Sequence, residues 1–456
     1  MQFKQFALIV FSISVSVFYI LFLFITNQFT VSSFSLVNNN NNSNGHCIIE
    51  KWNNITTNKL PHTFSRWLWM KLNLSHDDNM NTTTMSILGA YVYPDYISVT
   101  ITSQYLSKKH IICRYFDCSR KELIGSSWKS VVFPESVVYC PRRKGARYVS
   151  LTEKNGEKPQ TPVALTFRAY RKPVHEYTVC VAPLYGDEPK WLQIVEFVEH
   201  YKLQGATYFY FYIGNVTDYD RRILNDYVRT GDIELIHLQD KYERPFFSWH
   251  LLEIQDCHQR SKYHSKWTTF VDIDERIEAK KGNTVEYLRS VDDSVGEIQI
   301  MAKRIIKSED VPPKYINKKE LKKEMLFRKY TNSSVATWKA SKPIIRSDKI
   351  GIMSIHYAVA LNPGYKTIRI DSTKAVLKHY RNTKFRMFGA NWENDETDYQ
   401  NLTQHNMPFY DILSTKVSER VGSVYERVNV NCSTISSYLW KSRQMIDPCK
   451  EKPESF

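Results

Sequence analysis

Two aspartates separated by one residue end an apolar run in residues 267–277, WTTFVDIDERI. If the run is a strand, Asp272 and Asp274 point to the same side, because side chains alternate along a strand. Glu275 follows directly. Carboxylates that converge on one point repel each other unless a cation lies between them, and Mg²⁺ or Mn²⁺ prefers such oxygen ligands while leaving room for a diphosphate. The pattern therefore favours a metal site that holds a nucleotide diphosphate.

The D-x-D spacing is also compatible with other kinds of site. The spacing also occurs in turns and at helix N-caps that bind no metal. The sequence has no G-x4-G-K-[ST] segment, which excludes a P-loop. A phosphatase with an aspartyl nucleophile would carry its D-x-D on the first strand of its sheet, whereas here three strand-like runs come before it. A metal-diphosphate site remains the preferred interpretation.

The elements before the D-x-D alternate between strand and helix. Apolar runs typical of strands occur at 177–186, 206–214, 233–238 and 266–274, and helical patterns separate them at 191–205, 218–230 and 249–262. This alternation with short connections predicts an α/β fold with a parallel sheet covered by helices on both faces. Such sheets bind ligands at the carboxyl ends of their strands, which is where Asp272 and Asp274 are expected.

Composition divides the rest of the chain. Residues 6–25 carry no charge over about 20 positions, the length of a membrane-spanning helix, and a cleaved signal peptide is the rival interpretation. The predicted organisation is a cytosolic tail at 1–5, a membrane anchor at 6–25, a flexible stem at 26–58, a β-rich lumenal segment at 59–172, a catalytic domain at 173–445 and a C-terminal tail at 446–456.

The charge distribution and the cysteines predict the compartment. Lys4 precedes the anchor and no charged residue follows it until Glu50, so the positive-inside rule places the body on the lumenal side, in agreement with eight N-x-S/T sequons. Eight cysteines could pair in an oxidising lumen, although Cys180 and Cys257 could equally be buried thiols. The net charge of +15 comes without a nucleic-acid-binding motif, so a solvated basic surface and no nucleic-acid partner are expected.

Four segments together resemble the family 92 glycosyltransferases. They are 177–212, which begins YTVCVAPLYG, 253–277, which ends WTTFVDIDERI, KPIIRSDKIGIMSIHY at 342–357, and LKHYR at 377–381. The resemblance implies a GT-A fold with a mixed, mostly parallel sheet, an inverting transfer from a UDP-sugar, and a Mn²⁺ or Mg²⁺ ion held by the D-x-D. It also implies a single-pass type II protein of the Golgi membrane with a lumenal catalytic domain. Members of known activity transfer galactose, in animals onto fucose in the core of N-glycans.

The resemblance also implies roles for individual residues. Asp272 and Asp274 match the metal-binding D-x-D, and a late histidine commonly joins the metal or the diphosphate. His379 is the first choice for that histidine and His356 the second. The residues expected to contact the nucleotide are Pro183, Leu184, Asp256, Asp272, Arg346 and Arg381.

Inverting transfer needs a general base for the acceptor hydroxyl, and a carboxylate usually serves. Glu309 and Asp310, in KSED, are the candidates, and both could equally be solvated loop charges. They lie in the tract 301–316, where the family usually has a glycine-containing loop near the acceptor. Two alternatives therefore stay open: an enzyme of the same mechanism with another UDP-sugar, and a catalytically silent, membrane-anchored glycan-binding protein.

Overall fold

The structure is a computed structural model that describes residues 51–61, 85–102, 106–168, 170, 172–239, 246–382, 400–401 and 407–426. The predicted cytosolic tail, membrane anchor and C-terminal tail lie outside these residues. Within the described part of the chain, no helix has both the length and the apolar character needed to cross a membrane. Contacts group residues 53–456 into one compact unit and residues 1–52 into another.

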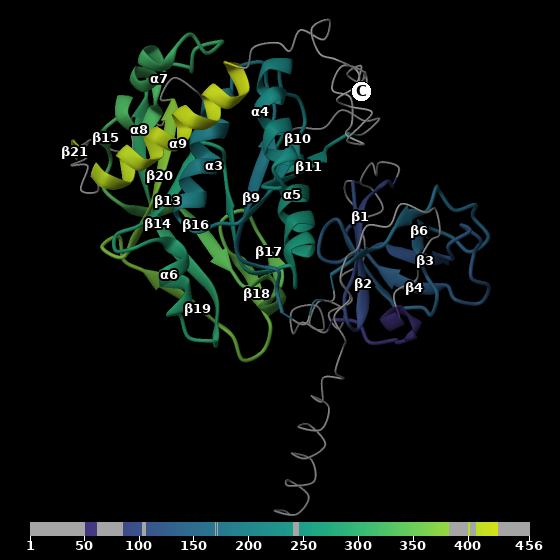
Figure 1. The fold of residues 1–456 in the computed structure, drawn as a ribbon. Coiled ribbons are helices and arrows are strands. Elements are labelled where there is room, and N and C mark those ends of the chain that lie inside the picture. The colour runs from purple at the N-terminus through teal and green to yellow at the C-terminus, as the bar shows by residue number, and fades with distance from the viewer. Residues whose placement is uncertain are drawn as a thin grey trace, which may run out of the picture. The chain divides into compact units, whose positions relative to one another are not determined.

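A mixed sheet forms the centre of the larger unit (Figure 1). Four parallel strands come first in the order β11, β10, β9 and β12, as the strand-helix alternation predicts. β16 then pairs antiparallel with β12, and β14 pairs antiparallel with β16. The strands are β9 (His175–Leu184), β10 (Tyr208–Ile213), β11 (Ile233–His237), β12 (Ser265–Val271), β13 (Glu275–Ala279), β14 (Val295–Lys307), β15 (Asn332–Ser333), β16 (Thr337–Ile345), β17 (Ile350–Met353), β18 (Ala358–Leu361), β19 (Lys366–Ile370), β20 (Ala375–Asn382) and β21 (Gln400–Asn401).

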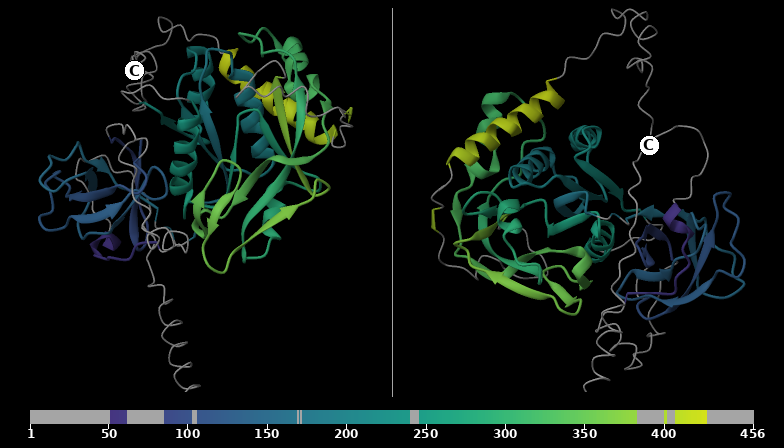
Figure 2. Two further views of the ribbon diagram at one scale, coloured as in Figure 1. Left: turned by 180° about the vertical axis from the view of Figure 1, so that it is seen from behind. Right: turned by 60° about the horizontal axis from the view of Figure 1, so that its bottom comes forward.

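Helices cover both faces of the parallel part of this sheet, which explains the long apolar and buried runs of β9, β10 and β12. Along β10, Phe209 and Phe211 face one core with α3 and α4, whereas Tyr210 and Tyr212 face a second core with α5. Helix α9 packs against α3 and α4, as both views in Figure 2 agree. The helices are α3 (Trp191–Leu203), α4 (Asp218–Arg229), α5 (Phe246–Ser261), α6 (Thr284–Arg289), α7 (Lys318–Glu324), α8 (Leu326–Lys329) and α9 (Met407–Tyr425), with short 3-10 turns η2 (Lys51–Asn54) and η3 (Ser347–Lys349).

The segment before β9 is rich in strands, as predicted. It forms two four-stranded sheets, in the orders β5-β2-β1-β8 and β4-β3-β6-β7. Its strands are β1 (Ile87–Val92), β2 (Tyr96–Ile101), β3 (His110–Phe116), β4 (Trp128–Val131), β5 (Val137–Pro141), β6 (Tyr148–Thr152), β7 (Val163–Ala164) and β8 (Thr166–Phe167). Asn53, assigned to the flexible stem by sequence, is fully buried, and its carbonyl accepts the N–H of Gly145 at 3.4 Å. The folded body therefore begins before the predicted boundary at residue 59.

Asp256 of α5 joins this β-rich segment to the larger sheet. Its Oδ1 accepts the hydroxyl of Tyr91 at 2.8 Å and that of Thr100, while its Oδ2 accepts the hydroxyl of Tyr212 at 2.6 Å and the Nε of Arg260 at 2.9 Å. Because the carboxylate is fully buried and both oxygens are occupied, Asp256 has a structural role. This corrects the prediction that it contacts the nucleotide.

Two disulfides are described, Cys113–Cys140 and Cys180–Cys257. The second joins β9 to α5 and corrects the interpretation of its cysteines as free thiols. The buried carboxylate of Glu253 lies within 4.8 Å of both sulfurs, the one such grouping of possible metal ligands in the described ranges. Sulfurs that are bonded to each other do not act as thiolate ligands, so this grouping is no metal site.

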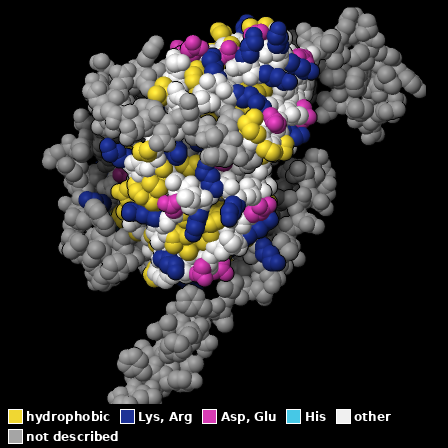
Figure 3. All heavy atoms as spheres, turned by 90° about the vertical axis from the view of Figure 1, so that its left-hand side faces the viewer, with side chains coloured by type: hydrophobic (Ala, Val, Ile, Leu, Met, Phe, Trp, Pro, Cys, Tyr) yellow, Lys and Arg dark blue, Asp and Glu magenta, His cyan; other side chains and the backbone are white. Residues whose placement is uncertain are grey.

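The surface agrees with the positive net charge. Figure 3 shows Lys and Arg side chains spread over one face, with apolar side chains between them. The basic residues are scattered over the described part of this face.

Candidate active site

The D-x-D motif lies in a turn just beyond the carboxyl end of β12. β12 ends at Val271, and the N–H of Glu275 donates to the carbonyl of Asp272 at 3.0 Å, which closes a β-turn. The Glu275 side chain then accepts the N–H of Asp272 at 2.8 Å. The expectation that strand alternation orients Asp272 and Asp274 is therefore wrong, because a turn closed by two hydrogen bonds fixes their directions instead.

Lys342, which sequence reasoning missed, lies between two of these carboxylates. It is 1% exposed, and its Nζ is 3.2 Å from Asp272 Oδ2 and 3.1 Å from Glu275 Oε2. Burial alone would lower the pKa of Lys342, but the carboxylates outweigh burial and raise the pKa above its ordinary value. The site therefore contains a permanent positive charge.

Strand register explains why Lys342 and not Arg346 reaches the site. β16 runs antiparallel to β12 with Ile345 opposite Thr268, so Lys342 is level with the carboxyl end of β12 and Arg346 with its beginning. Four residues of strand separate the two, roughly 13 Å. Arg346 instead holds Asp293, with Nη1 2.7 Å from Oδ1. The prediction that Arg346 contacts the nucleotide is corrected accordingly.

His379 faces the turn from β20. This strand pairs antiparallel with β13, and His379 lies opposite Glu275. Its Nε2 is 3.4 Å from Asp274 Oδ2 and its Nδ1 is 3.6 Å from Glu275 Oε1. Burial would lower the pKa of His379, but the Asp274 carboxylate outweighs it and raises the pKa above its ordinary value. The structure thus brings the preferred late histidine to the D-x-D.

Two further histidines surround Asp272. His250 of α5 has its Nε2 3.8 Å from Asp272 Oδ1 and 4.0 Å from Glu253 Oε2, and burial lowers its pKa to about 4. His356, the second choice by sequence, donates from Nδ1 to the carbonyl of Ser341 at 3.1 Å. Sequence reasoning missed His250, although it lies one helical turn before Glu253, where the matching segment 253–277 begins.

The acidic side chains of the turn differ in their ionisation. Burial raises the pKa of Glu275 to about 7. Burial acts on Asp272 in the same direction, but the charge of Lys342 outweighs it and lowers the pKa below its ordinary value. For Asp274, the charge of His379 outweighs burial in the same way and lowers the pKa below its ordinary value. Asp272 and Asp274 are therefore anions at neutral pH, whereas Glu275 is near its midpoint.

The donor set at this turn has the chemistry that a divalent cation of the Mn²⁺ or Mg²⁺ kind prefers, although its ligand atoms do not all lie within 4.8 Å of one another. The side chains of Asp272 and Asp274 are 32% and 27% exposed, so both are open to solvent. His379 Nδ1 and Glu275 Oε1 are buried, face each other and have no hydrogen-bond partner within the described ranges. A carboxylate behind the ring is the usual way to orient a metal-binding histidine. Asp272, Asp274 and His379 Nε2 are the groups that would hold the ion.

Pro183 and Leu184 are the last two residues of β9, directly before the loop that carries Tyr185. Both are buried at the end of β9, and the Leu184 carbonyl accepts two backbone N–H groups from the loop after β10, at 2.8 and 3.2 Å. Tyr185 follows them, and its pKa is raised by burial and then by the charges of Asp272 and Asp274. The side chain that this loop offers to the site is therefore Tyr185. Arg381, two residues after His379, adds positive charge that acts on Asp274.

The two candidate bases, Glu309 and Asp310, lie near different lysines. Glu309 is held by Lys329 of α8, with 2.9 Å between Oε2 and Nζ. Asp310 lies 4.0 Å from Lys307. Burial lowers the pKa of Lys307 below its ordinary value, and the charges of Asp310 and Asp274 partly oppose this shift. Residues 301–307 of the predicted acceptor loop belong to strand β14, so the loop itself begins at residue 308. Lys307 thus connects Asp310 with the D-x-D turn.

Comparison with models of known protein families identifies the family of this chain. The model of glycosyltransferase family 92 matches residues 175–412, which are more than half of the chain. The chain belongs to glycosyltransferase family 92. The match contains the D-x-D turn, Lys342, and the three histidines around the turn.

Individual relatives of this family 92 member are more distant. A galactan β-1,4-galactosyltransferase of Arabidopsis thaliana is 28% identical over 116 residues, which are 25% of this chain and 23% of that protein. The chain thus spans about a quarter of that relative's length. Among solved structures, S. aureus TarS 1-349 in complex with UDP has a TM-score of 0.20 at 15% identity, covering 38% of this chain and 47% of that chain. A Pyrobaculum calidifontis mannosyltransferase with GDP-Man and Mn²⁺ has a TM-score of 0.25 at 14% identity, covering 46% and 58%.

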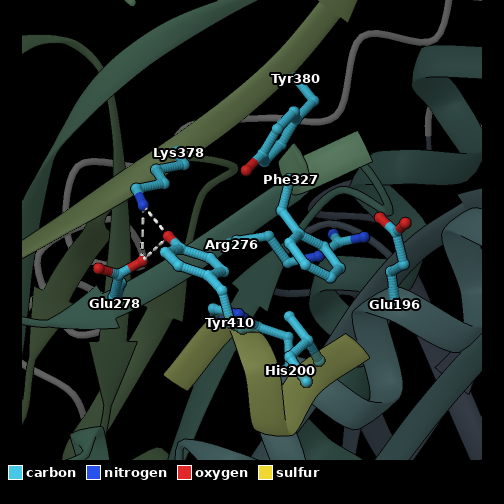
Figure 4. Close-up of a pocket in the computed structure, with 9 residues that line it drawn as sticks. Glu196, His200, Arg276, Glu278, Phe327, Lys378, Tyr380 and Tyr410 are labelled. Carbon is cyan, nitrogen blue, oxygen red and sulfur yellow. Dashed lines mark hydrogen bonds and ion pairs between the residues drawn. The ribbon is translucent and has the colours of Figure 1, made fainter. Parts of the chain in front are cut away.

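A second polar cluster, formed by Glu278, Lys378 and Tyr410, joins strands β13 and β20 to helix α9. Glu278 Oε2 accepts from Lys378 Nζ at 2.7 Å and from the Tyr410 hydroxyl at 2.6 Å, and Figure 4 shows the three side chains meeting. Glu278 and Lys378 lie on β13 and β20, the strands that carry Glu275 and His379. Helix α9 is thereby fixed to the two strands that carry Glu275 and His379.

Proposed function

We propose that this family 92 member is an inverting, metal-dependent galactosyltransferase of GT-A fold. It would transfer galactose from UDP-galactose to a glycan acceptor on a glycoprotein, such as fucose in an N-glycan core. The observation that carries the proposal is the D-x-D turn at the carboxyl end of β12, where Asp272 and Asp274 face His379 and Lys342. Two ionised carboxylates, one histidine and nearby positive charge are the chemistry that a metal-bound sugar diphosphate requires.

Each part of the site has a role in this proposal. Asp272, Asp274 and His379 bind the ion, which when present stabilises the charge of the departing diphosphate. Arg381, close to Asp274, binds a phosphate oxygen. Asp310 takes the proton of the acceptor hydroxyl while the acceptor oxygen attacks the sugar carbon and UDP departs. Asp310 is preferred to Glu309 because its neighbour Lys307 connects it with the D-x-D turn, whereas Glu309 Oε2 lies 2.9 Å from Lys329 of α8.

The proposed location is the Golgi lumen, with 6–25 as a type II anchor. Two described disulfides support an oxidising compartment. Of the eight sequon asparagines, Asn54, Asn215 and Asn332 have a described exposure, and each is exposed. These positions are accessible to glycosylation on a lumenal body.

The first test is UDP release from a panel of UDP-sugars by the purified full chain, with and without Mn²⁺. We expect Mn²⁺-dependent release from UDP-galactose. Asp274→Asn should lower it by two orders of magnitude or more while thermal unfolding stays close to that of the wild type, because a partly exposed metal ligand is lost and no core packing changes.

The outcomes separate the alternatives. Release from a different UDP-sugar would keep the mechanism and change the donor. Binding of UDP and Mn²⁺ without release, in the presence of glycan acceptors, would favour the silent glycan-binding protein. Full Mn²⁺-dependent turnover by Asp274→Asn would contradict the metal assignment.

A further inference from the structure

Lys342 occupies an unusual place for a lysine in a site that must attract a cation. Its ammonium group touches Asp272 Oδ2 and Glu275 Oε2, and at 1% exposure it is shielded from solvent. The remaining oxygen of Asp272 is faced by the ring of His250, whose Nε2 lies 3.8 Å from Oδ1. One of the two D-x-D carboxylates is thus already neutralised by the protein itself.

Lys342 places a positive charge against the turn before any ligand binds, with its Nζ 3.2 Å from Asp272 Oδ2 and 3.1 Å from Glu275 Oε2. A divalent ion that arrives alone therefore gains little, because repulsion by Lys342 opposes attraction by the carboxylates. A nucleoside diphosphate brings negative charge of its own, which offsets the positive charges of the metal and of Lys342.

We propose that Lys342 makes metal binding at the D-x-D turn depend on the nucleotide. The free site binds Mn²⁺ weakly, and UDP and Mn²⁺ strengthen each other's binding. This inference rests on the proposed function for its ligands, and it adds a role for a residue of which the D-x-D motif gives no sign. Lys342 is a positioning residue here, since it does not bind the ion itself. Its charge offsets the attraction that Asp272 exerts on the ion.

Whether Mn²⁺ affinity rises or falls when Lys342 is replaced distinguishes this role from a purely structural one. If Lys342 only holds the turn in shape, replacing it weakens Mn²⁺ binding, since Asp272 loses its orientation. If Lys342 opposes the ion, replacing it with an uncharged residue strengthens Mn²⁺ binding in the absence of UDP. Even at the dielectric constant of water, a unit charge a few ångströms from a divalent ion changes its affinity by about tenfold.

The experiment measures Mn²⁺ affinity by electron paramagnetic resonance of the free ion, with and without saturating UDP, on the purified full chain. We expect weak binding by the wild type alone and binding at least about tenfold tighter with UDP. Lys342→Met should bind Mn²⁺ alone at least about tenfold tighter than the wild type, and UDP should then add less. Lys342→Arg keeps the charge and should behave as the wild type.

Lys349→Met is the matched control, since it removes a lysine of the same segment that pairs with Asp348 at 2.7 Å. Its Mn²⁺ affinity should equal that of the wild type. If Lys342→Met fails to fold because the buried carboxylates lose their hydrogen-bond donor, Lys342→Gln removes the charge but keeps a donor, and it is judged by the same criterion.

Unchanged or weaker Mn²⁺ binding by the folded Lys342 variant would overturn the inference. So would a wild type that binds Mn²⁺ and UDP without mutual effect, although the proposed function would then stand. A wild type that binds neither Mn²⁺ nor UDP would overturn both.

Discussion

At the scale of single residues, the Glu275 carboxyl group is the centre of the turn. It accepts the backbone N–H of Asp272, contacts Lys342 and stands behind the ring of His379. Burial holds its pKa at about 7, so small changes around it alter its charge at neutral pH. The acidic residue after a D-x-D is therefore a structural part of the site, as well as a source of charge.

The base can be tested with a pair of neighbouring variants. Asp310→Asn should lower kcat/KM by about 10²- to 10⁴-fold, the usual contribution of a general base. Glu309→Gln is the matched control and should retain activity within a few-fold, because Glu309 pairs with Lys329. Both variants should unfold at the wild-type temperature, since each side chain is more than 60% exposed. Equal losses in both variants would argue against Asp310 as the base.

At the scale of elements, strand register decides which residues meet. The order of strands and helices from β9 to β12 could be predicted, because hydrophobic period and turn residues are local signals. The partner of β12 on its other side could not, since β16 begins 66 residues after β12 ends and pairs antiparallel. Lys342 and Arg346 both belong to a matching segment, and only the register shows which of them reaches Asp272.

Contacts between residues far apart in the sequence also explain why the prediction for Asp256 was wrong. Asp256 belongs to a matching segment, and an aspartate before the D-x-D strand is a reasonable candidate for nucleotide binding. Its partners Tyr91 and Thr100 lie 165 and 156 residues away in the sequence, so no local pattern could show that both oxygens are already bonded. His379, in contrast, was predictable because the family resemblance carries it directly.

Helix α3 contains a buried acid whose ionisation should appear in stability. Burial raises the pKa of Glu196 to about 8, and its Oε1 accepts the N–H of Leu326 at 2.8 Å. In the unfolded chain the pKa is about 4.3, so the folded state retains a proton that the unfolded state has lost. The free energy of unfolding should therefore fall as the pH rises from about 5 to about 8.

Glu196→Gln keeps the hydrogen-bond acceptor and removes the ionisation. Urea denaturation at pH 5 and pH 8 should show a smaller loss of stability for this variant than for the wild type, by roughly 2–4 kcal/mol. Glu419→Gln, on the exposed side of α9, is the control and should follow the wild type. Identical pH dependence in wild type and Glu196→Gln would mean that Glu196 is ionised in the fold.

At the scale of the whole molecule, the unit that folds begins near residue 53. Removing residues 1–44 and adding a secretion signal should give a body that is secreted and still releases UDP, because Asn53 and its contacts are retained. Removing residues 1–58 is the comparison. It deletes the fully buried Asn53 and should lower the secreted yield and the unfolding temperature. Equal behaviour of both truncations would mean that Asn53 contributes nothing to the body.

The hydrogen bonds to Asp256 also have a consequence for synthesis in the cell. Tyr91 and Thr100 leave the ribosome 165 and 156 residues before the carboxylate that they will bind. At ordinary rates of translation this delay is on the order of ten to thirty seconds. During that time the first strands must stay soluble with two polar hydroxyls facing a partner that does not yet exist, so the earliest part of the chain is the part most in need of a chaperone.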